Sequence, residues 1–159
     1  MALKRKPVAL SAALAALLAA AAWSPSEVRA QTPTETVATA QTFDELQEKL
    51  ASAVEANKMV VVTKACASCG AARRDVTIPG NIVFGVYRND FAVRMLEASI
   101  PAGIQAPIRF YITENDDGTA SLTYQMPSSV FAPYGSADLD TMAQEMDEIW
   151  KKIVDETVD

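Results

Sequence analysis

Apolar side chains recur every three or four positions in three segments of the chain, and this spacing predicts three α-helices. The first segment runs from Thr42 to Asn57 and opens with Thr42 and Glu45, a capping-box pair that marks a helix start. The second covers residues 91–99, and the third runs from 136 or 138 to about 154. Acids at the start of the third segment and lysines near its end suit the helix macrodipole.

Four shorter segments have the pattern of β-strands. Residues 59–63 are a β-branched run that predicts a buried strand, and residues 82–87 predict a second one. Gly85 within the second indicates a bulge or the close approach of another group to the sheet. Residues 107–114 and 119–126 flank an Asp-Gly turn and predict a hairpin, the first of them with clean alternation. The segment that joins the first two strands is expected to be a loop.

The predicted order over residues 42–159 is α-β-β-α-β-β-α. It predicts a single α+β domain of two layers, with a mainly antiparallel sheet of about four strands and helices on one face. The other face is then solvated or used for dimerisation or ligand binding. Residues 31–41 are rich in Thr, Gln and Ala without a periodic apolar pattern, and we expect them to form a flexible leader.

Residues 1–30 have the layout of a secretory signal peptide. Basic residues at 4–6 precede an Ala- and Leu-rich stretch at 8–22, and small side chains near Ala30 predict cleavage after that residue. An uncleaved membrane anchor is the alternative, but the stretch is shorter than the roughly 20 apolar residues that a spanning helix needs. We therefore expect a periplasmic protein without stable membrane insertion.

Charge and composition argue against several classes of function. Loss of residues 1–30, with four basic residues and one acid, takes the net charge from −6 to −9. Such an acidic chain is poorly suited to bind nucleic acid, which requires basic surface. The chain has no histidine, which excludes His-dependent catalysis and His-bearing metal sites, and its two cysteines cannot complete a four-ligand zinc site. We expect no metal, no cofactor and no catalytic residue.

Cys66 and Cys69 form a C-x-x-C pair in the expected loop, close to Arg73 and Arg74. A redox-active pair needs a helix that begins at the first cysteine, where the helix dipole lowers the pKa of the thiol. Residues 70–79 leave room for about one helical turn. A passive disulfide in an oxidising compartment is the favoured interpretation. A redox-active pair and a metal site at a dimer interface stay open as alternatives.

The joint between the second predicted strand and the second helix is a candidate ligand site. Tyr87, Arg88 and Asn89 lie there, where backbone N–H groups and a guanidinium favour an anion or polar ligand. The alternative is ordinary capping by Asn89 or Asp90, with Asp90 and Arg94 as a surface ion pair.

The predicted hairpin supplies a second group of candidates. Arg109 and Tyr111 share the polar face of its first strand, and Tyr124 lies on its second strand. A pocket between sheet and helices lined by Phe84, Tyr111 and Tyr124 would suit a ligand carrier. The alternative is a solvated sheet face.

Three segments, TFDELQEKLASAVEANKMVVVTK, NIVFGVYRNDFAVRMLEASIPAGIQAPIRFYITENDDGTASLTYQMPSSVF and the closing helix, resemble the domain of unknown function 302 family of bacteria. The resemblance covers nearly the whole predicted domain. It implies a TATA-binding-protein-like α+β fold that is often dimeric through the sheet, and it implies no established chemistry. We therefore expect an exported, non-catalytic binding module, a homodimer that takes a small ligand or a protein partner. The alternative is a periplasmic thiol-disulfide redox protein.

Overall fold

The computed structural model describes residues 32–159, which belong to one compact unit. In chain order the elements are β1 (Glu35–Ala38), α1 (Phe43–Ala56), β2 (Val60–Cys66), α2 (Ala67–Ala72), β3 (Asn81–Tyr87), α3 (Asn89–Ala98), the 3-10 helix η1 (Ile100–Gln105), β4 (Ile108–Glu114), β5 (Ala120–Tyr124), α4 (Pro127–Phe131), the 3-10 helix η2 (Ala132–Tyr134) and α5 (Ala137–Val158). The predicted signal peptide lies outside the described residues.

Helix α1 begins at the predicted capping box. The Thr42 hydroxyl accepts from the Glu45 backbone N–H, and the Glu45 carboxylate accepts from the Thr42 N–H at 2.9 Å, so two unpaired donors of the first turn are satisfied. The helix ends at Asn57, as predicted. Its buried face, Leu46, Leu50 and Val54, has the helical spacing read from the sequence.

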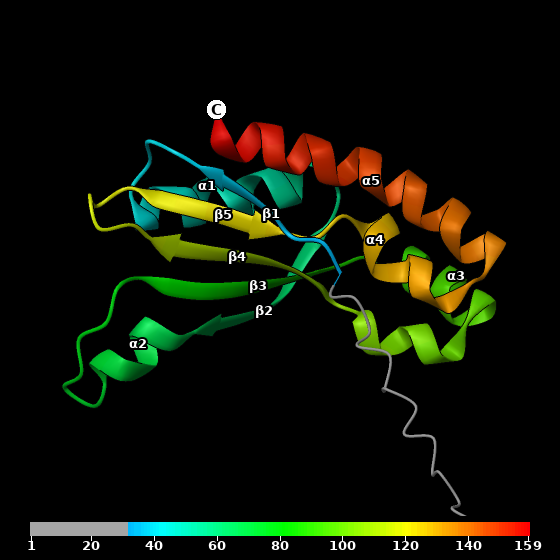
Figure 1. Ribbon diagram of the computed structural model, residues 1–159, viewed down its shortest axis with the longest axis horizontal. Helices are drawn as coiled ribbons and strands as arrows, with labels where there is room; N and C mark the ends of the chain where they lie inside the picture. Colours follow the sequence, from blue (N-terminus) through cyan, green and yellow to red (C-terminus); the bar gives the residue numbers. More distant parts are fainter. Residues whose placement is uncertain (1–31) are drawn as a thin grey trace, which may run out of the picture. The chain divides into compact units, whose positions relative to one another are not determined.

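The five strands form one antiparallel sheet in the order β1-β5-β4-β3-β2, and helices pack on one of its faces (Figure 1). The α+β class and the one-sided arrangement of helices are therefore confirmed. Aromatic side chains occupy the core between the two layers. Phe110 of β4 stacks on Trp150 of α5 at a ring separation of 4.9 Å, and Phe84 of β3 is fully buried. The predicted hairpin is present as β4 and β5, with Gly118 in the left-handed conformation at its turn.

The sheet has one strand more than predicted, because part of the expected leader is ordered. Glu35–Ala38 pairs with β5 as the edge strand β1, so the prediction of a flexible leader over residues 31–41 is wrong for these residues. The Thr36 and Thr123 hydroxyls hydrogen-bond across the two strands at 2.9 Å. This stabilisation comes from a segment 87 positions away and leaves no local pattern in the sequence.

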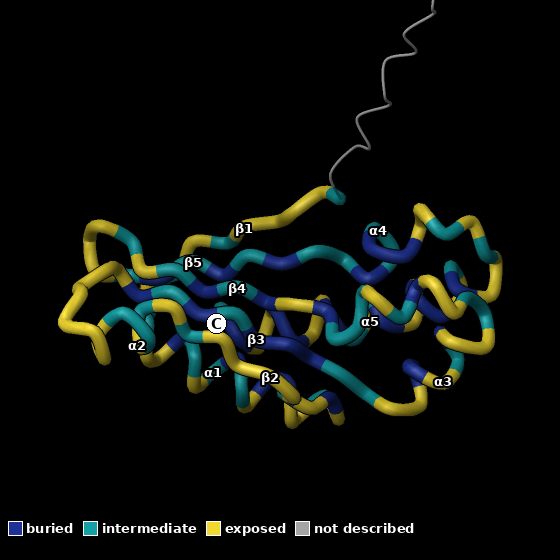
Figure 2. The backbone as a smooth tube through the Cα atoms, turned by 90° about the horizontal axis from the view of Figure 1, so that it is seen from below, coloured by how far each residue is buried: buried dark blue, intermediate teal, exposed yellow. Residues whose placement is uncertain are grey.

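The strand β2 is the opposite edge of the sheet and is mostly exposed, so the prediction of a buried strand at 59–63 is wrong. Val60 and Val62 are 56% and 47% exposed, because among residues 32–159 no further strand or helix covers this edge (Figure 2). The segment that contains the cysteines also differs from the expected loop. The strand continues to Cys66, and the six-residue helix α2 follows it directly.

Gly85 has the close neighbours that its place in a strand predicts. A Cβ atom there would lie 2.2 Å from Thr63 Oγ1 and 2.8 Å from Pro107 Cγ. The pairing of β2 with β3 skips Val62 at this point, which makes a β-bulge opposite Gly85. The glycine therefore lets Thr63 and Pro107 approach the same position of the sheet.

Candidate functional site

Within the described part of the chain, one face of the sheet carries no helix, and we call its side chains the open face. Because side chains alternate along a strand, these residues point away from the buried positions of the same strands. Strand pairing places them in three cross-strand rows: Thr36, Thr123, Tyr111, Val83 and Ala65; Ala38, Ser121, Thr113 and Asn81; and Arg109, Gly85 and Thr63. Figure 2 views the sheet from this side, with α5 behind it.

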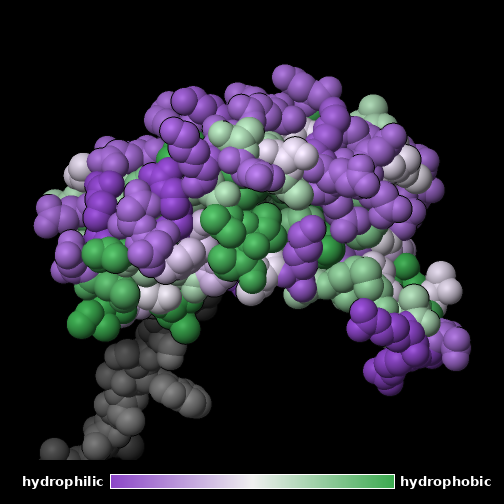
Figure 3. All heavy atoms as spheres, turned by 180° about the vertical axis from the view of Figure 1, so that it is seen from behind, coloured by the Kyte–Doolittle hydropathy of each residue, from purple (hydrophilic) through white to green (hydrophobic). Residues whose placement is uncertain are grey.

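The open face is nearly free of charge, in contrast to the acidic chain as a whole. Among the residues of its three rows, Arg109 is the one charged side chain, and there is no carboxylate. Most of the others are hydroxyl, amide or small side chains, with Tyr111 near the centre. By contrast, the helical side of the molecule is mostly hydrophilic (Figure 3, top). The centre of a protein interface typically has few charged side chains and is enriched in Tyr and Arg, and the open face shares these features.

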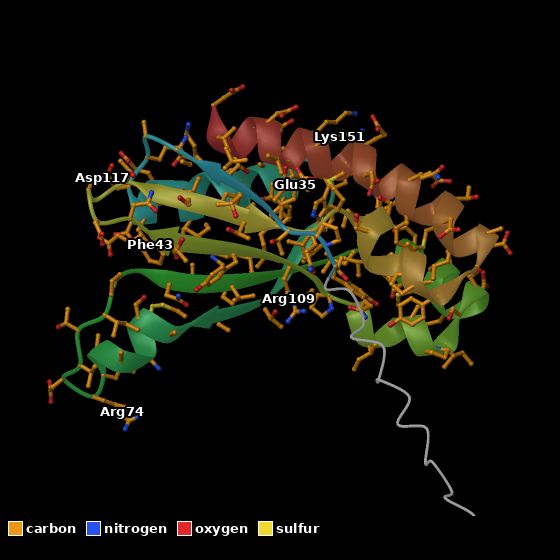
Figure 4. The ribbon with its side chains drawn as sticks, viewed as in Figure 1. Glu35, Phe43, Arg74, Arg109, Asp117 and Lys151 are labelled. Carbon is orange, nitrogen blue, oxygen red and sulfur yellow. A yellow bond between two sulfur atoms is a disulfide. The ribbon has the colours of Figure 1, made fainter. Side chains whose placement is uncertain are left out.

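The cysteine pair lies at the end of the edge strand, where β2 passes into α2. The two sulfur atoms are joined by a disulfide, and Cys66 Sγ accepts a hydrogen bond from the Cys69 backbone N–H at 3.0 Å. Cys66 is half-buried and Cys69 is exposed. Arg73 is the C-cap of α2. The Arg74 side chain, which follows it, points away from the disulfide (Figure 4).

A chain of hydrogen bonds connects the disulfide ring with the open face. Ser68, which lies between the two cysteines, accepts from the Asn81 N–H at 3.1 Å and donates to the Asn81 carbonyl at 3.4 Å. Its hydroxyl is also 3.5 Å from Cys66 Sγ. The Asn81 side-chain amide then donates to the Tyr111 hydroxyl. Residues from three segments of the chain thus meet at one corner of the sheet.

The joint after β3 is occupied by local contacts. Arg88 is the N-cap of α3 without a side-chain capping bond, and its guanidinium pairs with Asp90 at 2.7 Å and lies 4.1 Å from the centroid of the Phe91 ring. These hydrogen bonds hold the pKa of Asp90 below its usual value. Tyr87 donates to the Asn89 side chain at 3.3 Å.

Neither detail of the capping alternative is therefore correct. Asp90 pairs with Arg88 across two positions, and Arg94 pairs with Glu145 of α5 at 2.6 Å. The cavity beside this joint has a volume of about 20 Å³, which is room for one water molecule. The ligand site at Tyr87, Arg88 and Asn89 stays a prediction. An organic ligand does not fit the cavity at its present volume.

Tyr124 lies on the helix-covered side of the sheet, apart from Arg109 and Tyr111. Its ring packs against Phe110 at 5.9 Å, and its hydroxyl donates to Glu35 of β1 at 2.8 Å. Burial, together with this hydrogen bond, raises the pKa of Tyr124 to about 12. Because Phe84 and Tyr124 face the helices and Tyr111 faces the other way, the prediction that these three line one pocket is wrong.

A second exposed surface lies at the end of the molecule formed by α3 and η1. Ile100 and Ile104 are 78% and 82% exposed, and Leu96 and Val93 are about half exposed beside them. Buried Ala102 and the hydrogen bond from Gln105 to Tyr134 at 2.9 Å hold η1 in place. Hydrophobic side chains gather at this end of the molecule (Figure 3, lower left).

The model of the family described as Domain of unknown function DUF302 matches residues 35–157. The chain belongs to the DUF302 family. A solved structure with a similar fold is the crystal structure of an uncharacterized conserved DUF302 protein from Bacillus stearothermophilus. It has a TM-score of 0.69 and 14% identity, and the match covers 78% of this chain and 97% of that one. No curated protein matches the chain.

The DUF302 match begins at β1, which the sequence pattern had assigned to a leader, and it brings no catalytic or binding residue with it. Over residues 32–159, no cluster of acidic or cysteine side chains could hold a metal ion. Within the same residues, no helix is long and apolar enough to cross a membrane. Sequence reasoning missed three polar residues. Ser68 and Asn81 connect the cysteine pair with Tyr111, and Glu35 accepts a hydrogen bond from Tyr124 on the helix-covered side of the sheet.

Proposed function

We propose that this DUF302 protein is a small, non-catalytic interaction module of the periplasm that self-associates through the open face of its sheet. Export rests on the predicted signal peptide, and intact mass spectrometry of the protein recovered from the periplasm tests it. The expected polypeptide begins at Gln31. A chain that still begins at Met1 would contradict the predicted cleavage.

A second copy suits the open face because of its charge. Two molecules with a net charge of −9 repel each other, and opposed carboxylates at an interface cost several kcal/mol. The open face presents no carboxylate, so two copies meet there without opposed acids. The donors of Arg109 would face the hydroxyl and amide acceptors of Thr113, Asn81 and Thr123 on the other copy. The absence of acids from this face is the observation that carries the proposal.

Two variants with the same chemical change test the surface. Thr113→Glu puts a carboxylate on the open face, and Thr141→Glu puts one on the exposed side of α5. Analytical ultracentrifugation over a concentration series should show a dimer for wild type and for Thr141→Glu. For Thr113→Glu we expect a dimer dissociation constant at least tenfold higher, because an acid at an interface core is desolvated.

A monomeric wild type at all concentrations would overturn the proposal. A dimer that both substitutions leave intact would place the interface elsewhere. Ile104→Asp then distinguishes the surface of α3 and η1, because this substitution should dissociate a dimer that forms there and leave one formed by the open face unchanged. Association of the protein with a different polypeptide, in place of a second copy, is a further outcome that contradicts self-association.

A second candidate function, thiol-disulfide exchange, is supported by the cysteine geometry. A thiolate of an external dithiol attacks the exposed Cys69 sulfur, forms a mixed disulfide with it and expels Cys66 as a thiolate. The Cys69 N–H, which donates to Cys66 Sγ, stabilises that leaving group. The second thiolate of the dithiol then releases Cys69, so that two electrons and two protons pass to the protein and the dithiol becomes a disulfide.

The reduction potential separates a reactive pair from a passive one. A redox-active pair should equilibrate with glutathione at a potential above about −250 mV, whereas a structural disulfide lies below about −300 mV. With Cys66→Ser, the exposed Cys69 should form a mixed disulfide with a small-molecule disulfide, and with Cys69→Ser the half-buried Cys66 should do so more slowly. A potential below −300 mV, or equal rates for the two variants, would contradict this candidate function.

A further inference from the structure

We infer that the Cys66–Cys69 disulfide regulates the open face, by holding Tyr111 in its binding position through Ser68 and Asn81. The inference rests on the proposed self-association and adds a redox control to the same surface. It joins the two features that the proposed functions treat separately, the cysteine pair and the sheet face.

The contacts run without interruption from sulfur to sheet. Ser68 is held inside the ring that the disulfide closes, and its hydroxyl pairs with both backbone groups of Asn81. The Asn81 side chain is on the open face and donates to the Tyr111 hydroxyl. Tyr111 lies in the central row of that face, between Val83 and Thr123.

The segment that carries Ser68 depends on the disulfide for its order. Helix α2 has six residues and none of them is buried, so the core does not hold it. An isolated helix of this length is unstable in water. The contacts that keep it folded are the disulfide, the Cys66 cap and the pair of Ser68 bonds to Asn81. Reduction by a dithiol removes the first of these, and we expect α2 to unfold locally.

Local unfolding of α2 changes the open face without unfolding the sheet. Once Ser68 leaves, the Asn81 backbone N–H and carbonyl lose their partner on the side of β2, while the pairing with Thr113 and the hydrogen bonds between Gly80 and Glu114 on the side of β4 remain. The Asn81 amide then turns to water, and the Tyr111 hydroxyl loses its donor. Because an interface is weakened when one of its aromatic side chains must be ordered on binding, the reduced protein should dimerise five- to tenfold more weakly.

The test compares wild type, Ser68→Ala and Ser52→Ala, each oxidised and each reduced with dithiothreitol. Ser52 is an exposed serine of α1 and serves as the matched control. The chain has two cysteines, so dithiothreitol has no other disulfide within a chain to reduce. One measurement is the dimer dissociation constant by ultracentrifugation. The other is the NMR signal of the Tyr111 ring, assigned by its loss in Tyr111→Phe.

On reduction, wild type and Ser52→Ala should show a shifted Tyr111 signal and five- to tenfold weaker dimerisation. Oxidised Ser68→Ala should already have both properties, and its reduction should change neither further. A Tyr111 signal that is insensitive to reduction, or a Ser68→Ala protein that responds like wild type, would overturn the regulation even if the dimer is intact. A monomer in both redox states would instead overturn the proposed function, while the Tyr111 signal still tests the connection to the disulfide.

Discussion

Substitution of Gly85 by alanine tests the close approach on which this part of the sheet depends. The new Cβ would be 2.2 Å from Thr63 Oγ1 and 2.8 Å from Pro107 Cγ. Non-bonded heavy atoms have their optimal separation at about 3.5–4.0 Å, so both contacts are strongly repulsive. The Thr63 side chain is exposed and can rotate away, but the Pro107 ring cannot, and the strands must move apart by several tenths of an ångström.

Overpacking of this kind costs about 1–3 kcal/mol of unfolding free energy. Gly70→Ala is the matched control, because the same methyl group meets no atom within 4 Å at that position. Gly70 is inside helix α2, where alanine is more favourable than glycine by about 0.5–1 kcal/mol. The two variants should therefore change stability in opposite directions, and their free energies of unfolding should differ by roughly 1.5–4 kcal/mol.

Urea unfolding followed by Trp150 fluorescence measures both values. The double variant Thr63→Ala/Gly85→Ala should recover part of the loss, because it removes the Thr63 oxygen and leaves the Pro107 contact. A Gly85→Ala protein as stable as wild type would refute the close approach of Thr63 and Pro107 to this position. If Gly70→Ala also loses stability, an added methyl group destabilises the protein even where it meets no atom. The loss in Gly85→Ala could then not be attributed to Thr63 and Pro107.

Other contacts give predictions of smaller size. Thr42→Ala removes the hydroxyl of the α1 capping box and should lower the unfolding free energy by about 1 kcal/mol in urea. Because the pKa of Tyr124 is raised from 10.0 to about 12 in the folded protein, the unfolded chain releases this proton first, and stability should fall as the pH rises from 10 to 12. Tyr124→Phe keeps the ring on Phe110 and should make stability less dependent on pH in that range. Arg94→Ala breaks an exposed ion pair with Glu145 and should cost less than about 1 kcal/mol, measured in the same way.

The elements that the sequence predicted correctly are those with a local signal. Helix α1 has a capping box, a helical apolar stripe and a closing Asn57, and the hairpin has an Asp-Gly turn between two strands. In each case the residues that decide the structure lie in one continuous segment of the chain. The alternation in 107–114 also identified Phe110 and Ile112 as the buried face of β4.

The elements that were missed depend on distant partners or on a covalent bond. Strand β1 has four residues, too few for a pattern, and it is ordered by pairing with β5. Helix α2 buries no side chain and so leaves no apolar stripe in the sequence. For residues 59–63 the β-branched run predicts a strand, but the same run suits a central and an edge strand, and topology decides between them.

For the same reason, only part of the candidate site could be predicted from the sequence. Arg109 and Tyr111 could be placed on one strand face because alternation is local. The link from Ser68 through Asn81 to Tyr111 joins three segments of the chain, and each of its residues taken alone is an ordinary turn or strand residue. A short polar residue between two cysteines is a weak signal, and its role becomes clear only when the structure places the first residue of β3 beside it.

The edges of the sheet favour association through the open face over the addition of strands. An exposed edge strand offers unpaired backbone groups to another chain, unless it is short, charged or bulged. The edge strand β1 is four residues long and carries Glu35, while β2 has a bulge at Val62 and an exposed Lys64 and passes into α2 at Cys66. Both edges are therefore poor templates for a further strand. The open face, which is broad and nearly uncharged, has no such obstacle, and in our proposal the disulfide at the end of β2 is also the group that positions Tyr111 on that face.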